Sequence, residues 1–252
     1  MIRILLIGCN GRMGQAITLS AKERTDLVIA AGIDIHPTNL NTYPIYADLE
    51  NVQEQVDVVI DFSHPSGTQK ALDWAVANRT PIVMCTTGLS EAQLATLRTA
   101  SEKTAVLRSA NMSLGVNLLI ELAQKAAKAL YRDFDIEIVE KHHNQKLDAP
   151  SGTALAIADA MNEAIAGVNM AYVNGRHGNE AKRTKNEIGI HAVRGGTIPG
   201  EHTVLFAGQD ELIELTHTAL SRSIFAEGAL AAARYLAGKG PGFYTMKNLF
   251  AE

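Results

Sequence analysis

Proton donors stand directly before a predicted helix start in the segment Glu140–Leu155. Its sequence, EKHHNQKLDAPSGTAL, places two adjacent histidines shortly before Lys146. Imidazole exchanges protons near neutral pH, and a lysine ammonium supplies both positive charge and a transferable proton. Ser151 is a natural helix N-cap, which leaves the amides of Gly152 and Thr153 open to bind a carboxylate. The segment therefore predicts an enzyme that adds a proton and a hydride to an acidic substrate.

Two other interpretations of this segment stay open. His142, His143 and Asp148 could ligate a metal, although adjacent histidines point in different directions and no dedicated metal motif is present. The segment could also be a solvent-exposed polar loop. Lys146 and His142 would share a face in a helix, but the residues 148–150, Asp-Ala-Pro, favour a loop.

A glycine-rich loop, Gly8–Gly14, follows the first apolar run and opens the first helical pattern. Its spacing is G-x-x-G-x-x-G, because Asn10 occupies the usual middle position of the commoner G-x-G-x-x-G. Glycine lets the backbone approach a pyrophosphate, whose charge is met by the amides at the helix start. Its placement between strand and helix favours a dinucleotide site over a merely structural turn.

Asp34 closes the second predicted strand, twenty residues beyond Gly14. An acid at this place typically binds the ribose hydroxyls of NAD, whereas a nearby arginine accommodates the 2′-phosphate of NADP. The next residues are Ile35 and His36, although Arg12 in the glycine loop could still reach that phosphate. We expect NADH to be used at least as well as NADPH.

Two further loops fall at the same edge of the predicted sheet, at Cys85–Gly88 and Ser109–Met112. Their small hydroxyl and amide residues can bind the nicotinamide carboxamide and its ribose, or can be ordinary turn residues. The residues 61–65 are equally placed, and we interpret His64 there as a local hydrogen-bonding residue rather than a catalyst.

Short apolar runs and helical patterns alternate over the first hundred residues. The predicted strands are Ile2–Ile7, Leu27–Ile33, Val56–Ile60, Pro81–Cys85 and Ala105–Ser109, and the predicted helices are Met13–Ala21, Ser66–Ala77 and Glu91–Ser101. Continuous Val/Ile/Leu strands that alternate with helices predict a Rossmann-type doubly wound parallel sheet. Such α/β sheets bind ligands beyond the carboxyl ends of their strands.

The pattern changes after Asn111 and predicts a second α+β domain with a mainly antiparallel sheet. Its predicted elements are helices Leu114–Leu130 and Thr153–Ala164 and strands Asp135–Glu140, Glu187–Val193, Glu201–Ala207 and Glu211–Thr218, with a hairpin turn at 208–210. Val168–Asn186 is polar and basic and predicts a mobile surface loop, which is a linker, a substrate lid or a subunit arm. The helix Ser223–Leu236 is expected to return to the first domain. We therefore expect residues 1–112 and 221–252 to bind dinucleotide and residues 113–220 to serve substrate binding and oligomerisation.

Composition sets limits on function. The chain has 252 residues, 46% hydrophobic and 20% charged, with a net charge of -4, which gives no electrostatic case for nucleic acid. No apolar run approaches the ~20 residues needed to span a bilayer, and the apolar start is too short for a signal peptide. Two cysteines form no disulfide framework, and we expect a reducing cytoplasm.

The chain resembles the 4-hydroxy-tetrahydrodipicolinate (dihydrodipicolinate) reductase family of bacterial lysine and diaminopimelate biosynthesis, essentially from end to end. The matching motifs are Gly8–Gly14, Thr86–Gly88, Ala110–Asn111, Glu140–Leu155, Arg194–Gly196 and Gly200–His202. The resemblance implies the nicotinamide-dependent reduction of a cyclic unsaturated dicarboxylate to tetrahydrodipicolinate, with loss of water. It also implies a homotetramer built through the sheet of the second domain.

The resemblance also implies roles for individual residues. His142 would be the proton donor or acceptor, Lys146 the proton donor and His143 a substrate contact. Gly152 and Thr153 would hold a substrate carboxylate through their amides. The cofactor, NADH or NADPH, would contact Gly8, Cys9, Asn10, Gly11, Arg12, Met13, Asp34, Cys85, Thr86, Thr87, Ser109, Ala110, Asn111 and Met112.

Some features leave alternatives open. Cys85 and Met112 stand where family members often carry glycine and phenylalanine, so cofactor contacts there would be chiefly through the backbone. A related two-domain amino-acid or semialdehyde dehydrogenase is an alternative, but it does not explain His142–Thr153. A non-catalytic nicotinamide sensor would need the glycine loop and Asp34 but no proton donors.

Overall fold

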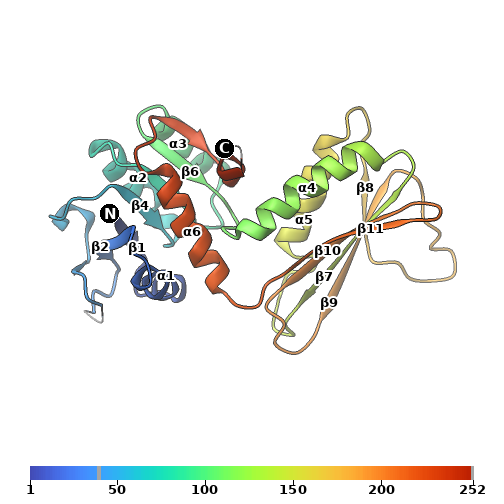
Figure 1. The fold of residues 1–252 in the computed structure, drawn as a ribbon, viewed down its shortest axis with the longest axis horizontal. Coiled ribbons are helices and arrows are strands. Elements are labelled where there is room, and N and C mark those ends of the chain that lie inside the picture. Colours follow the sequence, from blue (N-terminus) through green and yellow to red (C-terminus); the bar gives the residue numbers. More distant parts are fainter. Residues whose placement is uncertain (39–40, 251–252) are drawn as a thin grey trace. The chain divides into compact units, whose positions relative to one another are not determined.

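The computed structural model describes residues 1–38 and 41–250, and the chain forms two units that are each built on a β-sheet of their own (Figure 1). Unit 1 comprises Met1–Leu114 and the segment from Arg222 onward, and unit 2 comprises Gly115–Ser221. Within the part of the chain that the structure describes, no helix combines the length and the apolar character needed to cross a bilayer.

Unit 1 contains a seven-stranded sheet in which all paired strands run parallel. In sheet order its strands are β12 (Gly242–Tyr244), β6 (Ala105–Arg108), β5 (Ile82–Met84), β4 (Val58–Asp61), β1 (Ile2–Ile7), β2 (Leu27–Ile33) and β3 (Ile45–Tyr46). Its helices are α1 (Arg12–Lys22), α2 (Thr68–Ala77), α3 (Glu91–Ser101) and α6 (Ser223–Leu236), with single 3₁₀ turns at Leu49–Asn51, Pro65–Gly67 and Met246–Phe250. The short edge strands β3 and β12 are additions to the elements that the sequence predicts.

Helices cover both faces of this sheet, which is why most residues of its central strands are apolar. Ile4 and Leu6 of β1 pack in one core with α1 and α6, whereas Leu5 and Ile7 pack in the other core with α2 and α3. These four side chains of β1 are all buried. The doubly wound α/β sheet is confirmed, and α6 lies in unit 1 as predicted.

Unit 2 contains a five-stranded mixed sheet covered on one face by α4 (Leu114–Leu130) and α5 (Gly152–Ala164) (Figure 1). In sheet order its strands are β11 (Leu212–Thr218), β10 (Glu201–Ala207), β7 (Asp135–His142), β9 (Glu187–Arg194) and β8 (Ala171–Asn174). The pairs β11–β10 and β10–β7 are antiparallel, as expected, with a turn after Ala207. The strand β9 instead pairs parallel with β7 and β8, because the connection from β7 crosses over through α5 before it returns.

Residues alternate between the two faces of β7. Ile136, Ile138, Glu140 and His142 are buried on the face that packs against α4 and α5, and the residues between them are half-buried. The apolar part of this stripe forms core, and its last two members are ionisable. The alternation therefore carries Glu140 and His142 onto the helix-covered side of the sheet.

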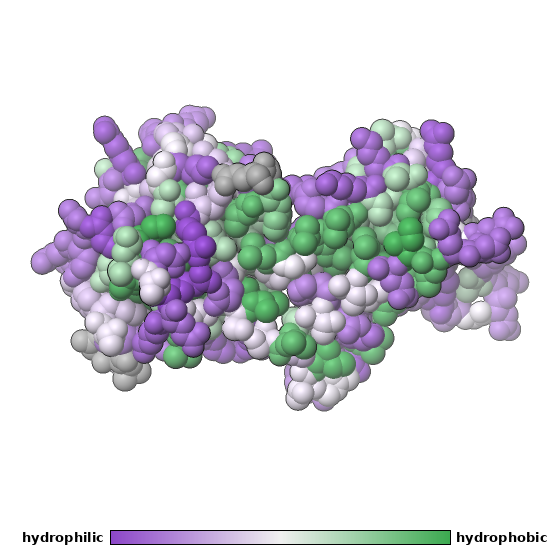
Figure 2. Space-filling view, in the orientation of Figure 1, coloured by the Kyte–Doolittle hydropathy of each residue, from purple (hydrophilic) through white to green (hydrophobic). Residues whose placement is uncertain are grey.

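Apolar residues gather over α4 on the visible surface of unit 2 (Figure 2). Leu119 and Ala123 of α4 are buried, while Leu118 and Leu122 are 45% and 43% exposed. The helix therefore presents apolar side chains to solvent as well as to the core.

The segment 168–186 is more ordered than the surface loop that the sequence predicts. It contains the edge strand β8, and its two arginines bind carboxylates of the sheet. Arg176 pairs with Glu137 and Glu187, and Arg183 pairs with Asp135 and Glu137. These ion pairs fix the segment to the sheet because each guanidinium meets more than one carboxylate.

Candidate active site

The glycine loop of unit 1 depends on close backbone approaches. Gly8 has a φ of +80°, and a Cβ there would lie 2.6 Å from the carbonyl oxygen of Phe62. A Cβ on Gly14 would lie 2.3 Å from the carbonyl oxygen of Gly8. Helix α1 begins after Gly11, which offers no side-chain cap, and no acidic residue lies in its first turn. The helix amides are thus presented to an anion beside a loop whose glycines let the backbone come close, which fits a pyrophosphate.

Asp34 lies at the end of β2 against this loop. Its Oδ2 accepts a hydrogen bond from the Asn10 amide at 3.0 Å, and its Oδ1 accepts one from the His36 amide at 3.1 Å. A carboxylate oxygen can accept two hydrogen bonds, so both oxygens of Asp34 can still accept one from a ribose hydroxyl.

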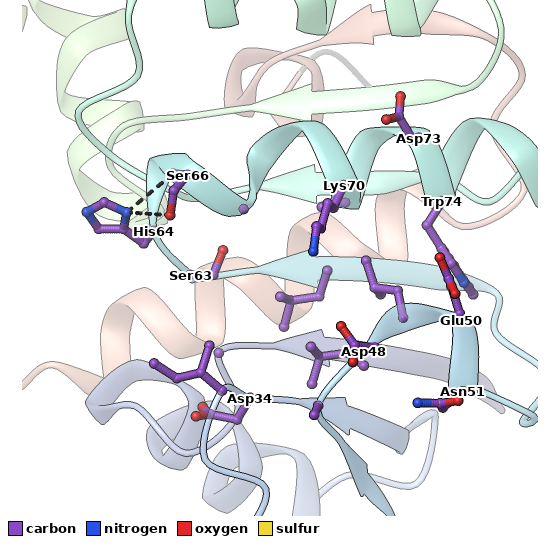
Figure 3. Close-up of a pocket in the computed structure, with 18 of the residues that line it drawn as sticks. Asp34, Asp48, Glu50, Asn51, Ser63, His64, Ser66, Lys70, Asp73 and Trp74 are labelled. Carbon is purple, nitrogen blue, oxygen red and sulfur yellow. Dashed lines mark hydrogen bonds between the residues drawn. The ribbon is translucent and has the colours of Figure 1, made fainter.

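A pocket of about 1020 Å³ opens beside Gly8 and Asp34 (Figure 3). Lys70 extends from α2 towards the wall that carries Asp34 and Asp48 (Figure 3). His64 lies at the rim, where its Nδ1 contacts the amide and the hydroxyl of Ser66 at 3.3 and 2.9 Å. His64 is therefore a local hydrogen-bonding residue, as the sequence predicts, and the pocket has the size of a nucleotide site.

The two other predicted cofactor loops lie at the carboxyl ends of β5 and β6, which are neighbours in the sheet. Thr87 and Ala110 are exposed, whereas Thr86 is buried. The Asn111 amide donates to the Ser109 hydroxyl at 3.2 Å, which holds the second loop in a tight turn. The strand order therefore brings both loops to the edge at which the glycine loop also lies.

Four of the predicted cofactor residues have buried side chains: Cys9, Cys85, Thr86 and Met112. They can meet a cofactor chiefly through their backbone. Burial raises the pKa of Cys9 to about 11 and raises that of Cys85 well above its usual value. Both thiols are unpaired and stay protonated at neutral pH, so they are structural rather than reactive.

The site of unit 2 is assembled by the register of three strands. Glu140 and His142 share a face of β7 because they are two residues apart. Arg194 of β9 lies opposite His142, and His202 of β10 lies opposite Glu140. Four polar side chains from three strands thus meet at one end of the sheet.

The Glu140 carboxylate is fully buried and receives four hydrogen bonds. Its Oε1 accepts from the Ser151 amide at 2.9 Å and from Arg194 Nη2 at 2.7 Å. Its Oε2 contacts His142 Nδ1 at 2.6 Å and accepts from Arg194 Nη1 at 2.7 Å. Burial alone would raise the pKa of Glu140, but the hydrogen bonds from Arg194, His142 and Ser151 lower it below its usual value. The carboxylate is therefore ionised at neutral pH.

Both histidines of the cluster are neutral at neutral pH. Burial lowers the pKa of His142, and the cations of Lys146 and Arg194 act in the same direction, while Glu140 opposes them. Burial lowers the pKa of His202 to about 4, and its ring meets that of His142 edge-on with centroids 5.2 Å apart. A neutral imidazole can accept a proton, which is the state a general base requires.

The segment after β7 is a turn rather than a helix. The Lys146 amide donates to the His143 carbonyl at 3.2 Å, and His143 is half-buried. The Ser151 hydroxyl caps α5 by accepting from the Ala154 amide at 3.1 Å, as predicted. The Gly152 amide donates to the carboxylate of Asp148 at 3.3 Å, so it can bind an anion. Thr153 follows it in the first turn of α5 and is half-buried.

In residues 1–38 and 41–250 no three His, Cys, Asp or Glu side chains are grouped as metal ligands.

Three residues of the unit 2 cluster were not assigned a role from sequence: Glu140, Arg194 and His202. Glu140 could have been identified by its spacing of two residues from His142. That spacing places both side chains on one face only if the strand continues through His142. The predicted strand ends at Glu140, and the observed strand ends at His142. Arg194 and His202 belong to strands distant in sequence, so only strand pairing could reveal them.

A doubly wound sheet with a glycine loop, together with a separate unit that carries an acid–base cluster, defines a two-unit nicotinamide-dependent oxidoreductase. The sequence model for the dihydrodipicolinate reductase N-terminus matches residues 2–112, and that for its C-terminus matches residues 115–250. The chain belongs to the dihydrodipicolinate reductase family, and the predicted family and enzyme class are confirmed.

Relatives match over nearly the whole chain. The 4-hydroxy-tetrahydrodipicolinate reductase of Caldanaerobacter subterraneus subsp. tengcongensis is 51% identical over 99% of this chain and 98% of its own length. That of Clostridium tetani is 46% identical over 98% of this chain and 96% of its own. The dipicolinate-bound dihydrodipicolinate reductase from Paenisporosarcina sp. TG-14 has a TM-score of 0.82 and 25% identity, with 97% of each chain covered. These matches do not favour the alternative dehydrogenase or sensor interpretations.

Proposed function

We propose that this protein reduces 4-hydroxy-tetrahydrodipicolinate to tetrahydrodipicolinate in the diaminopimelate and lysine pathway. One observation carries the substrate class: in unit 2 a carboxylate, that of Asp148, is bound by the Lys146 ammonium at 2.8 Å and by the Gly152 amide at 3.3 Å. A site that binds a carboxylate beside a neutral imidazole suits an acidic substrate that must also exchange a proton.

Unit 1 is proposed to hold the dinucleotide and unit 2 to hold the substrate and to form the oligomer. The glycine loop, Asp34 and the adjoining pocket support the first assignment. When bound, the reduced nicotinamide supplies a hydride. The loops at 85–87 and 109–112 are proposed to contact its ring and ribose.

The residues of unit 2 are proposed to manage protons and charge. Gly152 and Thr153 hold one substrate carboxylate through their amides, and His143 contacts the substrate. Lys146 donates a proton from Nζ to the carbon next to the reduced carbon–nitrogen system, and His142 donates or accepts a proton at Nε2. The Lys146 ammonium also stabilises the negative charge that develops as the hydride arrives. One water leaves the substrate overall.

We further propose that NADH is used at least as well as NADPH. The support is the acidic character of the pocket, to which Asp34, Asp48 and Glu50 contribute, against one lysine, Lys70. A 2′-phosphate beside Asp34 would meet a like charge. A hundredfold preference for NADPH in steady-state kinetics would contradict this.

A homotetramer built through the sheet of unit 2 is also proposed, on the family resemblance. Apolar side chains on strands of this sheet support it, since Val193 and Leu212 are 45% and 55% exposed. Light scattering coupled to gel filtration would test it. A reducing cytoplasm remains the predicted location, supported by the two unpaired cysteines.

A coupled assay tests the central proposal. The product of the preceding aldolase is supplied with either cofactor, and nicotinamide absorbance is followed. Oxidation of the cofactor that depends on the aldolase product is expected. Turnover of an amino acid or a semialdehyde instead, or cofactor binding without any turnover, would contradict the proposal.

A further inference from the structure

The Glu140 carboxylate is held by more donors than its structural role as a buried group requires. Two donors come from one guanidinium, which binds both carboxylate oxygens in a bidentate fork, and a third is the backbone amide of Ser151. These contacts fix the carboxylate plane and keep it ionised. The fourth contact, at 2.6 Å, is with Nδ1 of His142.

An ionised carboxylate can only accept hydrogen bonds. The proton shared between Glu140 and His142 is therefore carried by Nδ1, and in the neutral ring Nε2 is left with its lone pair. The positive charge of Arg194 keeps Glu140 ionised, so the proton between Glu140 and His142 stays on the histidine. Glu140 thus determines which of the two ring nitrogens of His142 is available for chemistry.

The surroundings of Nε2 agree with this. A Cβ on Gly200 would lie 3.0 Å from Nε2 of His142 and 3.3 Å from its Cδ2, so glycine keeps that side of the ring free of a side chain. The neighbouring ring of His202 is occupied elsewhere, because its Nε2 contacts the Ser151 hydroxyl at 2.9 Å. The ring of His142 is therefore oriented on one side and left open on the other.

We propose that Glu140 is a positioning residue that holds His142 in the Nδ1–H tautomer, so that Nε2 exchanges the proton in the reaction. This inference rests on the proposed role of His142. The charged and titratable groups that act on His142 are Glu140, Arg194, Lys146 and His202. Of these, only Glu140 is an anion, so its removal leaves His142 among cations and a neutral ring.

The test variant is Glu140→Gln, which keeps the shape of the side chain but replaces one oxygen by an NH₂ donor. Its oxygen would remain with Arg194 and Ser151, and its NH₂ would face Nδ1 of His142 and select the opposite tautomer. Turnover should fall at least about tenfold, the range seen when partners that orient catalytic groups are removed. The limb of the pH profile that reports His142 should move to lower pH, because the anion that raises its pKa is gone. Glu140→Asp, which retains the anion, should recover part of both effects.

Glu137→Gln is the matched control. Glu137 lies on the opposite face of the same strand, and it also binds an arginine and a histidine, with Arg183 Nε at 3.0 Å and His191 Nε2 at 2.8 Å. Loss of a carboxylate from an Arg–His network in β7 is therefore common to both variants. Only Glu140→Gln should change turnover and the pH profile.

Nitrogen-15 NMR of histidine-labelled wild-type protein tests the tautomer without any variant of Glu140, with His142→Gln used to assign the signal. The proposal requires a protonated Nδ1 and an unprotonated Nε2 in neutral His142. The opposite tautomer would overturn it, as would wild-type turnover and pH profile in Glu140→Gln while His142→Gln is impaired. If His142→Gln itself keeps full turnover, the proposed role of His142 fails, whereas the tautomer measurement still stands.

Discussion

Lys146 Nζ lies 2.8 Å from Oδ1 of Asp148, so the proposed proton donor is paired with a carboxylate of its own chain. The other oxygen of Asp148 accepts from the Gly152 amide at 3.3 Å. In the proposed function the Gly152 amide binds a substrate carboxylate and Lys146 protonates the substrate. We therefore expect Asp148 to occupy the place of the substrate anion and to be displaced when substrate binds.

Asp148→Ala should tighten the binding of dipicolinate, because the competing carboxylate is removed. The Asp148 side chain is 56% exposed, and exposed ion pairs contribute about 0.2–1 kcal/mol. We expect the dissociation constant to fall about 1.5- to 5-fold in titration calorimetry. Asp133→Ala, on the surface of the same unit, should leave it unchanged. Weaker binding in Asp148→Ala would mean that Asp148 orients Lys146 rather than competing with the ligand.

Lys146→Ala should lower turnover by about 10²–10⁴, the usual contribution of a positioned proton donor. The measurement is steady-state kinetics at saturating substrate, so that a loss of substrate affinity does not mask the effect. Lys128→Ala, an exposed lysine on α4, provides the comparison. Turnover close to wild type in Lys146→Ala would remove this residue from the mechanism.

Asp34→Ala should lower kcat/KM for NADH by about ten- to hundredfold, since hydrogen bonds to charged groups contribute about 1.5–3 kcal/mol. The loss should be smaller for NADPH, because removing the carboxylate also removes its repulsion of a 2′-phosphate. Initial rates with both cofactors give the ratio directly. Glu23→Ala, at the exposed end of α1, serves as the control. An equal loss for both cofactors would mean that Asp34 only stabilises the glycine loop and does not distinguish NADH from NADPH.

Stability should fall in mild acid because of His202. Its pKa is lowered to about 4 in the folded protein by burial, so the unfolded chain binds the proton more readily below about pH 6.5. The free energy of unfolding therefore decreases as pH falls from about 6.5 towards 4, by on the order of 3 kcal/mol for this residue. Urea unfolding at pH 7 and pH 4.5 should show a smaller decrease for His202→Asn than for wild type. His142, whose pKa is also lowered, accounts for part of the remaining slope. An equal decrease in the free energy of unfolding in both proteins would contradict the role given to His202.

Features that depend on neighbouring residues could be predicted from sequence. The need for glycine at Gly14 is local, because a Cβ there would meet the carbonyl oxygen of Gly8, and Ser151 caps α5 through a bond to Ala154, three residues on. The bounds of β1, β2, α3 and α4 agree with the predicted ones because strand and helix periodicities are local. The doubly wound sheet could be predicted for the same reason, because the alternation of its strands and helices is visible in local periodicity.

Features that depend on strand pairing could not be predicted in this way. The parallel direction of β9 follows from a crossover through α5, and the strand β8 is formed only by pairing with β9. The sequence by itself determined the glycine loop, the N-cap and the presence of His142 and Lys146. Only the tertiary structure decided that Arg194, 54 residues from Glu140, would hold that carboxylate against His142. Such a contact is set by the register between strands, which no local periodicity encodes.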